Sequence, residues 1–201
     1  MKEGFCWNFD DLVEMAVTGQ VSQPAVRRGG YVHGPDGVGE VLPGMYGITY
    51  SARVGDRAFG WAGDHVEPGV SIANPNELAD YALHYLTCIG NEAEVVTGLA
   101  KGAKGVVTGE HARLLIDFSP EVLEEMTVGD TIQIRARGRG LKLENHPDIE
   151  FKKMSPALAR VLGLRVEDGR VSCPVAMELP PRIMGSGAEL NAEFVDQDLM
   201  S

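Results

Sequence analysis

Apolar residues at helical spacing make segment 75–88 the clearest element of the chain. Asn74 can cap this helix, Pro75 suits its first position, and Glu77 completes an Asn-x-x-Glu capping arrangement. Gly90 then supplies the left-handed residue that commonly ends a helix. One face of the helix is expected to be buried, with Leu78, Tyr81, Ala82, Tyr85, Leu86 and Ile89 as its apolar residues.

Two shorter helices are predicted at 120–126 and 156–162. Each segment follows a serine that can cap the helix, and each begins with a proline, which is favoured at the first helical position. The residues expected to face inward are Leu123 and Met126 in the first helix and Leu158, Val161 and Leu162 in the second.

Most of the remaining pattern predicts strands. Over 131–137 apolar and polar residues alternate with period two, so Ile132, Ile134 and Ala136 should face a core while the arginines face outward. Segment 10–19 fits a short helix or a strand, and we favour a strand. Further candidate strands are 47–54, 111–118, 170–175 and 176–179.

A local repeat predicts a β-hairpin. The sequence Val-Val-Thr-Gly occurs at 95–98 and again at 106–109, and a glycine- and lysine-rich connector joins the two copies. Two β-branched runs joined in this way are typical of a tight strand–loop–strand unit. The 25 glycines are spread along the whole chain, which indicates numerous tight turns.

Together these patterns predict a single domain over residues 1–201. Its class is α+β and mainly β, with a barrel-like or folded sheet. One clear amphipathic helix, 75–88, and the two short helices accompany the sheet.

The net charge and the cysteines indicate which binding partners and which cellular compartment to expect. The net charge of −11 and the pI near 4.9 disfavour binding to nucleic acid or to an anionic membrane. Cys6, Cys88 and Cys173 are far apart and form no CxxC pair, so neither a disulfide framework nor a zinc knuckle is expected. No run approaches the ~20 apolar residues of a membrane span, and the first residues lack a signal core. We expect a cytoplasmic protein.

The run from Gly63 to Gly69 concentrates candidate chemistry, with Asp64, His65 and Glu67 between residues that break helices. In an extended segment His65 and Glu67 face the same side, as an oriented base or as two ligands of a divalent metal. A third ligand would come from elsewhere, with His111, Glu110, Asp117 and His33 as the candidates. The alternative is a turn that Asp64 caps, with His65 and Glu67 as surface polar residues.

The glycine-rich hairpin 98–109 is a second candidate region. Exposed backbone N–H groups together with Lys101 and Lys104 can hold the carboxylate or phosphate of a small substrate. The segment matches neither a P-loop nor a dinucleotide-binding motif. A flexible hairpin tip with solvated lysines is the alternative. Asn91 is expected to finish the cap of the preceding helix, although its amide could also bind a ligand.

Several long runs carry a resemblance to a known family. They are PGMYGITYSARVGD at 43–56, AGDHVEPGVSI at 62–72, CIGNEAEVVTGLAKGAKGVVTG at 88–109, GDTIQIRARGRGLKL at 129–143 and MGSG at 184–187. These runs resemble the prokaryotic domain-of-unknown-function family 4438, over most of the chain from about residue 20 onward. The resemblance implies a mostly β, soluble, cytosolic protein and specifies no activity.

Two functions remain open at this point. In the first, the chain is an enzyme or binding protein for a small anionic metabolite. His65 is its base or metal ligand, Glu67 orients that histidine, and Lys101 or Lys104 holds the anion. In the second, the chain is a non-catalytic ligand-binding protein or a homo-oligomeric assembly protein, an arrangement common among soluble chains. The sequence does not decide between them.

Overall fold

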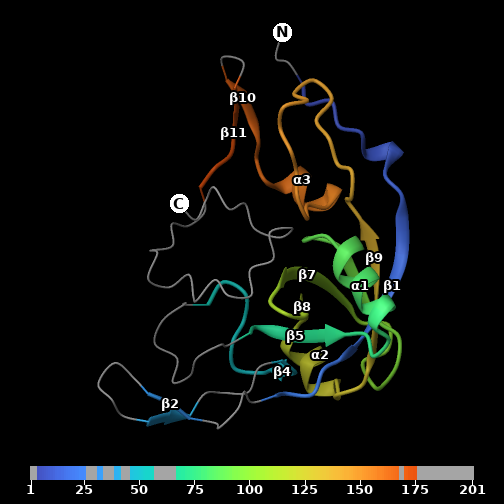
Figure 1. Ribbon diagram of the computed structural model, residues 1–201, viewed down its shortest axis with the longest axis vertical. Coiled ribbons are helices and arrows are strands. Elements are labelled where there is room, and N and C mark those ends of the chain that lie inside the picture. The colour runs from blue at the N-terminus through green and yellow to red at the C-terminus, as the bar shows by residue number, and fades with distance from the viewer. Residues whose placement is uncertain are drawn as a thin grey trace.

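Six antiparallel strands close into a barrel in the order β1–β9–β6–β7–β8–β5, and β5 pairs with β1 to complete the ring (Figure 1). The structure is a computed structural model that describes residues 4–25, 31–33, 39–41, 46–56, 67–167 and 170–175. The mainly β, α+β class and the barrel-like sheet are confirmed. The barrel strands are β1 (Glu14–Val21), β5 (Gly69–Ala73), β6 (Glu92–Val95), β7 (Lys104–Glu110), β8 (Leu114–Asp117) and β9 (Thr131–Arg137).

The barrel interior is filled by alternate residues of every strand. On β9, Ile132, Ile134 and Ala136 are buried while Arg135 is exposed, and the strand has the bounds that the alternation predicts. The hairpin of β6 and β7 is also confirmed, with antiparallel pairing between them. The other buried interior residues are Val17, Val21, Val70, Ile72, Ala93, Val95, Val107, Leu114 and Ile116.

The remaining strands are short. β4 (Ile48–Thr49) extends the sheet beside β5, so the strand predicted over 47–54 was too long. Segment 10–19 divides into a 3-10 turn, η1 (Phe9–Asp11), and the start of β1, in line with the favoured strand. Residues 176–179 lie outside the described part of the chain. Two further pairs of strands form antiparallel hairpins. β2 (Tyr31–His33) pairs with β3 (Gly39–Val41), and β10 (Arg165–Glu167) pairs with β11 (Arg170–Ser172).

Helix α1 (Glu77–Leu86) forms where it was predicted, but its cap and its buried face differ from the prediction. Asn76 rather than Asn74 is the cap, and its side chain accepts a hydrogen bond from the backbone N–H of Ala79. Leu83 is fully buried, whereas Leu78 is 77% exposed, and Tyr81 and Tyr85 are exposed as well. Two stripes of this helix have apolar helical spacing, and the barrel selects the one through Leu83.

The choice of face follows from the barrel wall beneath the helix. Gly19 of β1 has no side chain, and a Cβ at this position would stand 2.9 Å from the side chains of both Ile72 and Leu83. The glycine therefore leaves the space that Leu83 fills. The helical spacing of apolar residues does not show which stripe of α1 will face the space at Gly19.

The two short helices are confirmed as α2 (Pro120–Glu125) and α3 (Pro156–Val161). Leu123 and Met126 are buried as predicted. In α3 the buried residues are Pro156 and Ala159, and the prediction that Val161 faces inward was wrong because it is exposed. Ala159 packs in a cluster with Leu12 and Leu141.

A second, smaller hydrophobic cluster lies beside the barrel, where α3 and the N-terminal segment meet (Figure 1). Leu12, Leu141 and Ala159 are buried there, and the rings of Trp7 and Phe9 stack at 5.2 Å. None of the helices described in this structure has the length and apolar character that crossing a membrane requires.

Candidate functional site

Glu67 is a buried carboxylate whose two oxygens are both used by the protein. Its Oε1 lies 2.6 Å from Nδ1 of His111. Its Oε2 accepts hydrogen bonds from the hydroxyl of Ser71 at 2.8 Å and from the backbone N–H of Tyr46 at 3.0 Å. Only 7% of the Glu67 side chain is exposed. A carboxylate with three donors in a buried position is strongly fixed in place.

Two local features place Glu67 next to His111. Gly69 has a φ of +80°, and a Cβ there would stand 2.3 Å from the carbonyl oxygen of Ile116 on β8. Only glycine allows the chain to bend at this point, and the bend lets Glu67 reach Ser71. Ser71 is buried on the face of β5 opposite to Val70 and Ile72, outside the barrel core.

His111 opens the turn between β7 and β8. Glu110 pairs with Leu114, so His111, Ala112 and Arg113 form a three-residue loop in which the His111 N–H donates to the Arg113 carbonyl. The His111 side chain is 36% exposed. Because a carboxylate only accepts hydrogen bonds, its contact with Nδ1 places the ring proton on that nitrogen and makes Nε2 the basic one.

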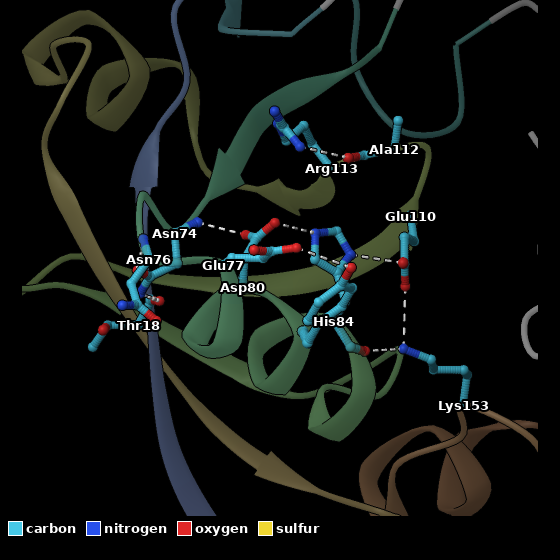
Figure 2. Close-up of polar contacts among 11 residues, drawn as sticks. Thr18, Asn74, Asn76, Glu77, Asp80, His84, Glu110, Ala112, Arg113 and Lys153 are labelled. Atoms are coloured by element: carbon cyan, nitrogen blue, oxygen red, sulfur yellow. Dashed lines mark hydrogen bonds and ion pairs between the residues drawn. The ribbon is translucent and has the colours of Figure 1, made fainter.

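Glu110, the residue before His111, holds a second histidine and a lysine (Figure 2). Its Oε1 lies 2.7 Å from Nδ1 of His84, and its Oε2 accepts a hydrogen bond from Nζ of Lys153 at 3.1 Å. Lys153 also donates to the backbone carbonyl of His84. On the other side of the imidazole, Asp80 Oδ2 lies 3.8 Å from Nε2. We call Glu67, His84, Glu110, His111 and Lys153 the turn cluster.

Burial shapes the chemistry of two neighbouring groups. It lowers the pKa of the Lys153 ammonium, and the carboxylate of Glu110 opposes this shift. It also raises the pKa of the Cys88 thiol, against the smaller effect of the nearby Lys153 and Arg139 charges. Cys88 is therefore a buried structural cysteine, as a position at the end of a helix suggests.

Backbone strain concentrates around the turn cluster. Among the non-glycine residues that the structure describes, positive φ angles occur at Tyr46 (72°), Ala112 (54°) and Lys153 (53°). Tyr46 donates to Glu67, Ala112 follows His111, and Lys153 contacts Glu110. Such conformations persist only where the surrounding structure enforces them, and they gather at functional sites.

The structure brings Glu67 and His111 together and places Lys101 and Lys104 elsewhere. Glu67 and His111 are in contact, whereas Asp64 and His65 lie outside the described residues. Lys104 begins β7 and His111 follows its end, so the rise of a strand puts them roughly 20 Å apart. Lys104 forms ion pairs with Glu92 and Glu94. Lys101 is exposed in the turn before β7, so neither lysine joins the turn cluster.

Asn91 has a structural role in this fold. Its side chain accepts a hydrogen bond from the N–H of Cys88 at 2.7 Å and donates to the carbonyl of Arg137 at 2.8 Å. The residue is buried, and the contacts join the end of α1 to β9. The C-cap of α1 is Thr87, so Asn91 does not finish the helix as expected.

No group of three histidine, cysteine or carboxylate residues in the described ranges is placed to hold a metal ion. Glu67 uses both oxygens on protein donors, an arrangement that suits an orienting group better than a direct ligand. A metal bound by His65, Glu67 and His111 stays a prediction, since His65 lies in the part of the chain that is not described.

Sequence reasoning missed Tyr46, Ser71, His84, Arg113 and Lys153. His84 and Lys153 are 69 residues apart and meet only because segment 153–155 runs beside the residues that follow α1. Neither has a motif around it. The one available signal was Glu110-His111, two ionisable residues directly before a turn, which were expected only as possible third ligands of a metal.

These observations define a small antiparallel β-barrel protein in which two carboxylate–histidine pairs meet at one turn. The chain belongs to the family described as "Domain of unknown function (DUF4438), N-terminal", whose model matches residues 31–160. The resemblance seen in the sequence is thereby confirmed. All five residues of the turn cluster lie inside the matched range.

The chain is also similar to a solved structure, the crystal structure of TM1086. The two are 43% identical with a TM-score of 0.83, and the match covers 92% of this chain and 66% of that one. This chain thus spans slightly less than two thirds of the length of TM1086. A comparison with the curated proteins found no match.

Proposed function

We propose that the protein is a small-molecule enzyme that transfers a proton through His111. The observation that carries the proposal is the buried Glu67 carboxylate 2.6 Å from Nδ1 of a partly exposed histidine. This pair holds the imidazole in one orientation and one tautomer, as a general base requires. Asp64 and His65, which precede Glu67 by three and two residues, join the proposal as further groups of the same site.

The proposed chemistry follows from the pair. Nε2 of neutral His111 accepts a proton from a carbon of the substrate, which keeps the electron pair of the C–H bond, and the ring becomes imidazolium. The ring proton then exchanges with solvent before a proton returns to the same carbon. The Glu67 carboxylate stabilises that cation through the Nδ1–H hydrogen bond and is a positioning residue. The substrate class is a small anionic metabolite, and a cytoplasmic location suits it.

Replacing His111 by glutamine should abolish proton transfer while leaving the fold intact, because the side chain is partly exposed. The assay incubates the protein in D2O with a panel of small carboxylated and phosphorylated metabolites and follows loss of C–H signals by proton NMR. We expect exchange to fall by about a hundredfold or more, the usual contribution of general acid–base catalysis.

His146→Gln is the matched control, because the backbone N–H of His146 donates to the carbonyl of Leu143, which pairs with Trp7, and His146 takes part in none of the described hydrogen bonds of Glu67 and His111. This variant should exchange at the wild-type rate. Wild-type protein that exchanges none of the panel, or His111→Gln that exchanges as fast as wild type, would contradict the proposal.

A second candidate, homo-oligomeric assembly, is favoured by one observation. Leu78, Tyr81 and Tyr85 form an exposed stripe along α1, and large exposed apolar stripes commonly mark interfaces. A second copy of the chain could cover this stripe through a two-fold contact. Replacing Leu78 by lysine is then expected to convert a dimer to a monomer in sedimentation velocity. A monomeric wild-type protein would exclude this candidate.

A further inference from the structure

Arg113 lies two residues after His111 in the same turn, and its guanidinium is held in a fixed position. The group stacks over the ring of Tyr46, with 5.0 Å between its central carbon and the ring centroid. Its Nη1 donates to the carbonyl of Ala112 at 3.1 Å, and the side chain extends away from the Glu110–Lys153 pair (Figure 2). A stacked and bonded arginine loses little entropy when it binds a ligand.

One nitrogen of this guanidinium has no partner. The Nε of Arg113 is buried, and among the described residues it makes no hydrogen bond. A buried donor without an acceptor is costly, so its persistence in a fold calls for an explanation. A ligand acceptor supplies one, since Nε and a terminal nitrogen together form the fork that takes a carboxylate or a phosphate in bidentate fashion.

The charged surroundings of Arg113 also differ from those of Arg135. Arg135 on β9 is paired with Glu14, and its Nε donates to the carboxylate at 2.9 Å. In the part of the chain that the structure covers, Arg113 makes no such pair, although the chain has 29 acidic residues. An arginine that an acidic protein leaves without a carboxylate is suited to an anion from outside.

Tyr46 joins this arginine to the Glu67–His111 pair. Its backbone N–H donates to Glu67, which holds His111, while its ring lies under Arg113. Tyr46 has a positive φ, and this strained backbone conformation lets the one residue contact both Glu67 and Arg113. An anion on Arg113 would thus be held by the same small set of residues that orients the imidazole.

We propose that Arg113 is the anion-binding residue of the site and takes a carboxylate or phosphate group of the substrate beside His111. The inference rests on the proposed function for the role of His111. Arg113 takes the place of Lys101 and Lys104, which lie at the other end of β7, as the positively charged residue that binds the anion. The substrate is then a small molecule with an oxyanion close to the bond that loses its proton.

Isothermal titration with two probes, malonate and inorganic phosphate, tests this assignment in the full chain at low ionic strength. Wild-type protein should bind at least one probe at millimolar concentration, and the preferred probe distinguishes a carboxylate from a phosphate site. Arg113→Gln should weaken binding by at least about tenfold, the effect of losing charge-assisted hydrogen bonds. Arg113→Lys should restore little of it, because lysine cannot form the fork.

Arg139→Gln is the matched control, because Arg139 also stacks on a tyrosine, Tyr85, at 3.6 Å from the ring centroid. This variant should bind as wild type does. The proposal is overturned if wild type binds neither probe, or if Arg113→Gln binds as tightly as wild type. His111→Gln separates the two ideas: retained anion binding without proton exchange supports both, whereas binding without any exchange in wild type defeats only the catalytic role.

Discussion

Replacing Gly69 by alanine is expected to lower the free energy of unfolding by about 4 kcal/mol, the largest effect among the changes considered. Two costs add at this position. A φ of +80° costs an L-residue about 1–2 kcal/mol. The new Cβ would also stand 2.3 Å from the backbone carbonyl of Ile116, which cannot move without breaking the pairing of β5 with β8.

The measurement is urea unfolding followed by circular dichroism, with thermal unfolding as a second readout. For a chain of this length the expected loss corresponds to a fall in Tm of ~10 °C. Gly102→Ala is the control that separates backbone strain from steric overlap of the new Cβ. Gly102 has a φ of +92° and open space around it. That variant should lose only about 1 kcal/mol. Equal losses in the two variants would mean that contact with Ile116 is unimportant.

Replacing Lys153 by alanine is expected to cost about 3 kcal/mol, because it leaves the carboxylate of Glu110 partly buried with one partner fewer. Only 8% of the Lys153 side chain is exposed, and its Nζ joins Glu110 to the end of α1. The neighbouring Lys152 is the control. It is exposed and lies 3.9 Å from an exposed glutamate, so Lys152→Ala should change stability by less than about 0.5 kcal/mol.

The free energy of unfolding should also change with pH in a direction set by Lys153. Burial lowers the pKa of Lys153 below its ordinary value, so between the folded and unfolded pKa values the unfolded chain binds more protons than the folded one. Stability contributed by this residue must then rise with pH across that alkaline interval. Urea titrations at several alkaline pH values should show the rise in wild type and lose it in Lys153→Ala. An unchanged slope would mean that the lysine titrates as it does in solvent.

Both changes act on the surroundings of His111. Gly69 lets the chain bend before β5 so that Glu67 reaches Ser71, and Lys153 fixes Glu110, the residue before His111. A functional site held in this way needs support from several elements, because a loop alone does not keep an imidazole oriented. Losing either support should therefore weaken the proposed proton transfer as well as the fold.

The sequence predicted the local elements well because their signals are local. Alternation over 131–137 gives the bounds of β9, the repeated Val-Val-Thr-Gly gives the β6–β7 hairpin, and serine–proline pairs give α2 and α3. Where two apolar stripes compete, as in α1, the pattern contains no information about which one meets the barrel. The gap at Gly19 decides it.

For the site, the sequence by itself determined the types of group available and that Glu67 and His111 were candidates. Only the tertiary structure decided that these two meet, that Lys101 and Lys104 do not join them, and that Arg113, His84 and Lys153 do lie at the turn. The physical reason is distance along the chain. Contacts between residues 44 or 69 positions apart depend on the closure of the barrel and on a bend at Gly69, and neither leaves a periodic trace in the sequence.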